Sequence, residues 1–250
     1  YAEARKLKAA AARSKGKVFV RHNRRFEPAF QHIREIIASG LLGKVYEIKL
    51  RRNGYGRRDD WQTLIRCGGG QLLNWGPHIV DHALQFLESP VAGLWSDLKK
   101  IAAVGDAEDH LRIILTGENG RVVDLEISGG SAIGEPTYLV TGTKGALTSD
   151  EREIRLRYLD PKKKLPRRRV KAASPPLGAY FGSPDVLEWI DETIPVKTPP
   201  GCAPDCDAIW DLLYDAIRHG KRFPITLDEA LEVMRVISQA KKGTPFASRP

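Results

Sequence analysis

The sequence predicts an α+β fold, an open and largely antiparallel β-sheet with helices on one face. Between residue 91 and about residue 159, short strands of alternating apolar and polar residues flank tight turns. Such consecutive hairpins indicate antiparallel pairing. Segments with helical periodicity lie before and after this region, as in folds whose helices are segregated to one side of a sheet. No G-x-G-x-x-G fingerprint follows a strand, so a Rossmann domain is not expected in this chain.

Composition sets the broad class of the protein. The 250 residues suffice for one large domain or two small ones, and 42% hydrophobic with 28% charged residues is ordinary for a soluble globular protein. No apolar run approaches the ~20 residues of a membrane helix. The three cysteines, Cys67, Cys202 and Cys206, form no C-x-x-C pair. This usage suits a reducing compartment, so we expect a cytoplasmic protein.

The N-terminal segment reads as a helix already under way. Tyr1 to Ser14 is rich in Ala, Lys and Arg, Lys15-Gly16 ends the helix, and Lys17–Arg21 reads as a strand. The chain opens without Met, and we expect it to be a piece of a larger protein. On this interpretation residues 1–16 finish a preceding domain, and residues 17–250 form one α+β domain.

The remaining elements follow from caps, turns and periodicity. Glu27-Pro28 begins a helix that runs to about Ser39, because Pro is favoured in the first helical turn. Thr226 and Glu229 form a capping box that begins the last helix, which ends near Lys242. A further helix is expected over Asp205–His219. The expected strands are Val45–Arg52, His110–Thr116, Arg121–Ser128, Tyr138–Thr141, Ala146–Ser149 and Glu153–Leu159.

The net charge of +9 raises nucleic acid as a partner, and one segment carries most of it. Pro161 to Lys171 (PKKKLPRRRVK) has seven basic residues and no acidic one. It also has two prolines and no aromatic residue that could stack on a base. We therefore interpret it as a solvated loop, and nucleic acid is not the expected partner.

A glycine-led stretch, GGGQLLNWGPHIVDHALQFL (Gly68 to Leu87), carries the chemistry. Three consecutive glycines are costly unless the backbone must turn sharply or approach another group closely. A helix beginning near Asn74 would be amphipathic, with a polar stripe and an apolar face. The stripe consists of Asn74, His78, Asp81 and Gln85, with His82 at its margin, and the apolar face of Ile79, Ala83, Phe86 and Leu87.

Three interpretations of this helix compete. The polar stripe could simply meet water. HIVDH resembles the H-x-x-E-H zinc pattern, but Asp81 replaces the glutamate and no third ligand stands out, so no metal is expected. Alternatively, His78 is a general acid/base at the mouth of a pocket, with Asn74 orienting it or a substrate hydroxyl. The residues alone do not decide between the first and the third.

GGGQLLNWGPHIVDHAL is similar to the G-G-G-x-L-x-D-x-G-x-H-x-x-D signature of the Gfo/Idh/MocA family of oxidoreductases. VRHNRRFEPAFQHIREIIASGLLGKVYEIKL, YLVTGTKGAL and PITLDEALEVMRVISQA resemble further segments of that family, so the resemblance spans about residues 1–246. Members bind NAD(P) on an N-terminal Rossmann domain and carry a catalytic lysine in a Glu-Lys-Pro motif. Neither is present in this sequence. The resemblance therefore implies the substrate-binding and oligomerisation portion of an NAD- or NADP-dependent enzyme that acts on a sugar-like or polyol substrate.

The resemblance also assigns site residues. His78 falls on the motif histidine, and Asn74 falls where many members have an aspartate. An amide can hold a hydroxyl group but cannot take up a proton. Asp81 matches the last acid of the motif, which we interpret as structural. Arg24, Tyr55, Arg58 and Trp61 fall in segments expected to reach the substrate.

Two hypotheses about function remain open. The first is an enzyme portion that performs no hydride transfer alone, because nothing in it binds the hydride carrier. The alternative, which Asn74 favours, is a non-catalytic binding or assembly module of the same fold. In either case we expect a homo-oligomer, most simply a sheet-to-sheet dimer. Its apolar surface is expected from Ile113, Leu115, Val123 and Leu125.

Overall fold

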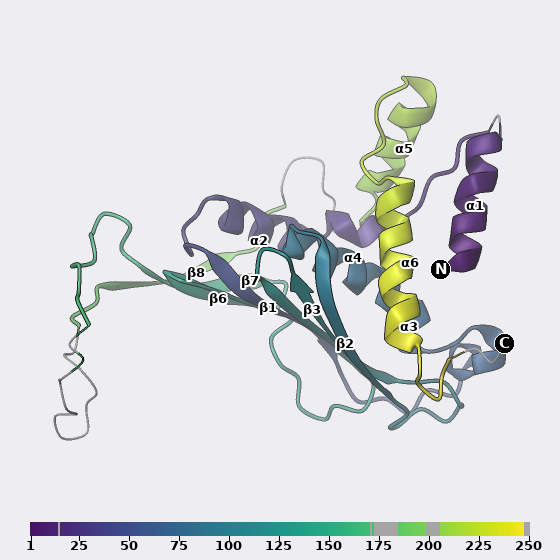
Figure 1. Ribbon diagram of the computed structural model, residues 1–250, viewed down its shortest axis with the longest axis horizontal. Helices are drawn as coiled ribbons and strands as arrows, with labels where there is room; N and C mark the ends of the chain where they lie inside the picture. The colour runs from purple at the N-terminus through teal and green to yellow at the C-terminus, as the bar shows by residue number, and fades with distance from the viewer. Residues whose placement is uncertain (15, 171, 173–184, 199–205, 248–250) are drawn as a thin grey trace.

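A computed structural model describes residues 1–14, 16–170, 172, 185–198 and 206–247. Its strands form one open sheet in the order β2-β3-β4-β1-β5-β6-β7-β8 (Figure 1). Of the neighbouring pairs only β1 and β4 run parallel, so the predicted largely antiparallel sheet is confirmed. The strands are β1 (Val45–Asn53), β2 (Val91–Lys99), β3 (His110–Gly117), β4 (Val122–Ser128), β5 (Tyr138–Gly142), β6 (Gly145–Ser149), β7 (Glu153–Leu159) and β8 (Trp189–Pro195).

Helices α2, α4 and α6 lie over one face of this sheet, as predicted (Figure 1). Apolar side chains of α4, such as Ile79 and Phe86, enter the same core as those of the strands. The capping box of Thr226 and Glu229 begins α6, which confirms that prediction. The helices are α1 (Ala2–Arg13), α2 (Pro28–Ala38), α3 (Gln71–Asn74), α4 (Gly76–Leu87), α5 (Ala208–Arg218) and α6 (Leu227–Lys241), with 3-10 turns at Asn23–Phe26, Trp61–Thr63 and Ile65–Cys67.

The predicted strand Lys17–Arg21 is wrong for the part of the chain that the structure describes. A β-strand needs a neighbouring strand to pair with its backbone hydrogen-bonding groups. Within the described residues, Lys17–Arg21 has no such neighbour and joins no β-ladder. Strands β2 and β8 were missed, since neither shows the clean alternation of a half-buried strand. Asp205 of the predicted helix, Lys171 of the basic segment and Cys202 lie outside the described residues.

The residues predicted to form the dimer surface lie on the opposite face of the sheet from the one left open. Ile113, Leu115, Val123 and Leu125 are fully buried in the core under the helices. The opposite face carries their neighbours in sequence, where Arg112 forms an ion pair with Asp124. On that face Trp95 pairs in register with Ile114 and is 53% exposed. The apolar residues of these strands therefore serve the core, and the open face is mixed in character.

Candidate active site

Each of the three glycines meets a local requirement: Gly68 has a φ of 73°, and Gly69 and Gly70 pass close to neighbouring groups. A Cβ atom on Gly69 would lie 2.4 Å from the Gln62 carbonyl oxygen, and one on Gly70 would lie 2.3 Å from Glu108 Oε1. Gly70 also has a φ of 109°, which L side chains rarely adopt. The glycine run is thus favoured by backbone conformation at Gly68 and Gly70 and by packing at Gly69 and Gly70.

The helix predicted to begin near Asn74 begins at Gly76, and Asn74 belongs to a separate short helix before it. The four-residue α3 ends at Asn74, and α4 begins at Gly76-Pro77 after a junction at Trp75. Pro77 fits there because its missing N–H falls in the first turn of α4. Asn74 Nδ2 donates to Gln62 Oε1 at 3.1 Å. Asn74 and His78 therefore sit on separate helices, one on each side of the junction.

His78 is a half-buried histidine whose Nδ1 is buried without a hydrogen-bond partner. Its ring lies edge-on to that of His22, with centroids 6.4 Å apart, and to Trp75 at 6.5 Å. Burial, followed by the positive charge of Arg24, lowers the pKa of His78 to about 4. The imidazole is therefore neutral near pH 7, and it is a weaker base than an unperturbed histidine.

Arg24 and His78 both contact the ring of Trp75. The Arg24 guanidinium stands 4.0 Å above the centroid of Trp75 and forms an ion pair with Glu27. The Arg24 carbonyl oxygen accepts a hydrogen bond from His82 Nε2 at 2.8 Å. The 3-10 turn Asn23–Phe26 thus contacts α4 through both the backbone and the side chain of Arg24.

The other three predicted substrate-binding residues lie in the loop after β1. Arg58 binds Asp60 through two hydrogen bonds of 2.8 Å and also donates to Gln62, the partner of Asn74. Tyr55 and Trp61 are 64% and 61% exposed, so both side chains lie mostly in solvent. The structure thus connects Arg58 to Asn74 and leaves Tyr55 and Trp61 at the surface.

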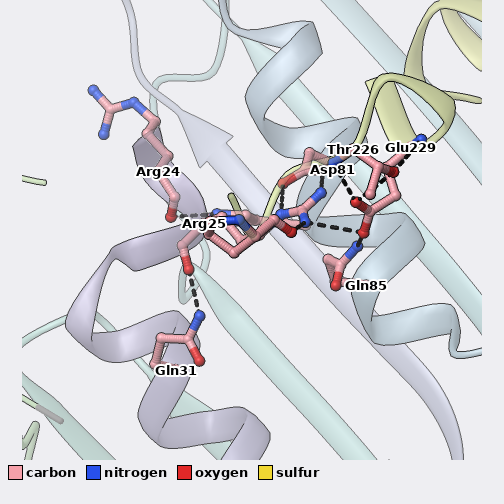
Figure 2. A network of polar contacts seen from close by, with 9 residues as sticks. Arg24, Arg25, Gln31, Asp81, Gln85, Thr226 and Glu229 are labelled. Atoms are coloured by element: carbon pink, nitrogen blue, oxygen red, sulfur yellow. Dashed lines mark hydrogen bonds and ion pairs between the residues drawn. The ribbon is translucent and has the colours of Figure 1, made fainter. Parts of the chain in front are cut away.

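A largely buried ion-pair network joins the 3-10 turn Asn23–Phe26 to α4 and α6 (Figure 2). Arg25 donates to Asp81 through Nε at 3.0 Å and through Nη2, and its Nη1 reaches Glu229 Oε1 at 3.0 Å. Asp81 is 1% exposed, so the middle of the predicted polar stripe faces protein and not water. Sequence reasoning missed Arg25 and Glu229. The only signal in the sequence was Asp81, because an acid that is buried on a helix needs a positively charged partner.

His82, the second histidine of the HIVDH segment, is also buried. Its ring stacks on Phe30 with centroids 3.9 Å apart, and burial lowers its pKa to about 3. Its Nε2 is already bonded to the Arg24 carbonyl. Among the described residues, no group of three or more His, Cys, Asp or Glu side chains is arranged to hold a metal ion.

A cavity of about 400 Å³ opens beside Trp75, at the end of β1. Arg52 enters it from β1, and its Nη2 pairs with Glu27 at 3.0 Å and with Glu151 at 2.6 Å. Gln71 and Trp75 also line it. Since Trp75 contacts His78 and also lines this cavity, it connects the two. The sequence analysis did not identify Arg52 or Glu151.

A dinucleotide does not fit the glycine loop of this chain. In a nucleotide site, free backbone amides at a helix N-terminus bind the phosphates. Here Gln71 N donates to the Glu108 carbonyl at 3.0 Å, and Leu72 N donates to Glu108 Oε1 at 3.1 Å. The amides that begin α3 are thus occupied, and Glu108 places a buried carboxyl group where a phosphate would have to lie.

Across the ranges that the structure describes, none of the helices has the length and apolar character required to cross a bilayer.

Comparisons with known proteins agree with this architecture. The family model of the GFO/IDH/MocA C-terminal domain matches residues 30–148. The uncharacterized oxidoreductase YdgJ of Escherichia coli (strain K12) is 28% identical over 245 residues, which cover 94% of this chain and 66% of YdgJ. The scyllo-inositol 2-dehydrogenase (NADP(+)) IolW of Bacillus subtilis (strain 168) is 24% identical over 251 residues, which cover 97% of this chain and 66% of IolW. The chain thus spans just under two thirds of the length of these two relatives.

Among solved structures, a NAD-binding protein from Listeria innocua superposes with a TM-score of 0.74. It is 21% identical, and the match covers 95% of this chain and 68% of that protein. At this identity the likeness shows the fold alone.

Proposed function

Because this chain belongs to the GFO/IDH/MocA family, with that family's C-terminal domain in residues 30–148, we propose that it is the substrate-binding and oligomerisation portion of an NAD(P)-dependent oxidoreductase. The proposed substrate is a sugar-like or polyol molecule, the class to which the inositol of IolW belongs. The observation that carries the proposal is the neutral His78, whose Nδ1 has no hydrogen-bond partner and whose ring contacts Trp75, a residue that lines the cavity at the end of β1.

In this proposal His78 is the general base for a substrate hydroxyl. Its imidazole nitrogen takes the hydroxyl proton while the carbon that bears the oxygen gives up a hydride. A group with a pKa lowered to about 4 is unprotonated at neutral pH and therefore free to accept a proton, but it is a weaker base than an unperturbed histidine. The positive charge of Arg24 adds to the lowering of the His78 pKa, so it keeps the free imidazole neutral at the cost of basicity. Asn74, held by Gln62, orients a hydroxyl but takes no proton.

The dinucleotide supplies the hydride acceptor, and we assign its binding to a further domain. Two observations support that assignment. The amides at the start of α3 are occupied, and the relatives are longer than the region they share with this chain. Residues 1–16 would then be the end of that domain, and residues 17–250 the substrate domain. Arg58, Tyr55 and Trp61 remain candidate substrate contacts from the loop after β1.

The second candidate function is a non-catalytic binding or assembly module. Asn74 favours it, because its amide is tied to Gln62 and an amide cannot act as a proton acceptor. The two candidates predict different results for the full-length protein supplied with NAD+ or NADP+ and scyllo-inositol. The enzyme reduces the nucleotide and loses this activity when His78 is replaced by Gln. The module gives no turnover in either form.

We also propose a homodimer formed through the open face of the sheet. Trp95, 53% exposed, and its register neighbour Ile114 provide apolar area on that face. A symmetric pair would cover this area with the same surface of a second copy.

A further inference from the structure

Glu151 holds a backbone conformation that its side chain makes costly. It lies in the turn between β6 and β7 with a φ of 77°. An L residue in the left-handed region costs on the order of a kcal/mol, and glycine would avoid that cost. The turn itself is fixed by neighbouring side chains, since Asp150 Oδ1 accepts from the amides of Arg152 and Glu153. A residue other than glycine at such a position suggests that its side chain has a role.

The side chain of Glu151 leads into the cavity beside Trp75. Its carboxylate binds Arg52 Nη2 at 2.6 Å while remaining 36% exposed. Arg52 already has a second carboxylate partner in Glu27 at 3.0 Å. Glu27 also pairs with Arg24, so the two arginines Arg24 and Arg52 are balanced by the two carboxylates Glu27 and Glu151. Because it is partly exposed, the Glu151 carboxylate keeps acceptor capacity at the cavity.

The charges around the cavity favour a neutral occupant. Arg51, on the neighbouring position of β1, pairs with Asp124 at 2.8 Å and lies 3.6 Å from Glu135. Asp124 also pairs with Arg112, so these two arginines are likewise balanced by two carboxylates. An anionic ligand would have to displace one of them or lie beside it. A hydroxyl group can instead accept from a guanidinium and donate to a carboxylate at the same time.

We propose that Glu151, together with Arg52, binds adjacent hydroxyl groups of a neutral polyhydroxylated ligand in this cavity. The proposal rests on the proposed function for the substrate class and adds the residue that selects within it. Truncating a hydrogen bond to a charged group costs enough to weaken binding by about tenfold or more.

Glu88 offers a matched control. It is also left-handed, with a φ of 51°, and its carboxylate also pairs with an arginine, Arg121, at 2.8 Å. Its side chain is 50% exposed, and it ends α4 away from the residues that line the cavity. Glu151→Gly and Glu88→Gly therefore remove the same backbone cost and one partly exposed ion pair each.

The test is a ¹H–¹⁵N chemical-shift titration of this chain with scyllo-inositol, repeated with glucuronate as an anionic comparator. We expect scyllo-inositol to shift the Trp75 indole and the amides around Glu151, and glucuronate to bind more weakly. Glu151→Gly should weaken scyllo-inositol binding at least tenfold, whereas Glu88→Gly should bind like the wild type. Glu151→Gln, which keeps the length and the backbone conformation, should fall between them.

Wild-type affinity in Glu151→Gly would overturn the proposal, as would polyol binding without shifts at Trp75 or stronger binding of glucuronate. The absence of any polyol binding would overturn it too. These outcomes are separable from failure of the proposed function. Turnover of the full-length protein that depends on His78 but not on Glu151 would preserve the function and end this inference. Polyol binding that depends on Glu151, in a full-length protein that shows no turnover, would preserve this inference and end the proposed enzymatic function.

Discussion

Replacing Asp81 with Asn tests whether the buried network of Arg25, Asp81 and Glu229 holds the domain together. Arg25 and Asp81 are 5% and 1% exposed, so the substitution leaves a buried guanidinium with one lost charge partner. Breaking a buried ion pair on one side costs about 3–5 kcal/mol. Because Glu229 still pairs with Arg25 at 3.0 Å, we expect the lower end, about 3 kcal/mol. For a domain of this size that lowers Tm by about 6–12 °C.

The assay is urea unfolding of this chain followed by circular dichroism, with Glu232→Gln as the control. Glu232 pairs with Arg235 on α6, but both side chains are partly exposed, at 38% and 27%. Exposed pairs contribute about 1 kcal/mol or less, so the control should unfold almost like the wild type. The double variant Arg25→Met/Asp81→Leu should recover much of the loss, since an apolar pair leaves no buried charge. If Asp81→Asn loses no more than Glu232→Gln, the network is not what joins the 3-10 turn, α4 and α6.

Three further predictions concern pH, the glycine loop and assembly. The folded-state pKa values of His78 and His82 are lowered to about 4 and about 3. The free energy of unfolding that these two histidines contribute is therefore full above their unfolded-state pKa of about 6.5 and is lost as pH falls toward 4. Urea midpoints should fall over that pH range, and they should fall less steeply in His82→Gln. Gly70→Ala should destabilise the chain by about 1–3 kcal/mol in the same assay, because its Cβ would meet the Glu108 carboxylate at 2.3 Å; unchanged stability would show that the loop can give way. Light scattering at micromolar concentration should find a dimer that Trp95→Lys converts to a monomer, whereas a monomeric wild type would contradict the proposed interface.

Regular local patterns predicted much of the fold. The hairpins between residues 110 and 159 follow from alternation and from turn residues, which act over a few neighbours. The start of α6 follows from the capping box of Thr226 and Glu229. What failed depended on partners distant in sequence. Lys17–Arg21 alternates like a strand, but the described residues offer it no neighbour. The face of the sheet to which Ile113 and Leu115 belong was set by the helices that cover it.

The candidate site divides in the same way. The spacing of Asn74 and His78 predicted a helix with polar residues at its start, but not the break at Trp75, because the break depends on packing around the glycine loop. Burial of Asp81 against Arg25 joins residues 56 positions apart, which no local pattern reveals. Glu151 reaches Arg52 from a turn about a hundred residues later in the chain. Its left-handed backbone was equally invisible, since the turn contains no glycine to mark it.

The central claim is that His78 accepts a substrate proton, and turnover by the full-length protein tests it most directly. His78→Gln and His82→Gln should be assayed side by side with NAD+ or NADP+ and scyllo-inositol, and the zinc content of each should be measured. We predict that His78→Gln lowers turnover by about 10²–10⁴, the usual contribution of a positioned acid/base group. His82→Gln should lose stability more than catalysis, because His82 packs on Phe30, and metal content should not depend on either histidine. Wild-type turnover in His78→Gln, or zinc lost together with either histidine, would contradict the account.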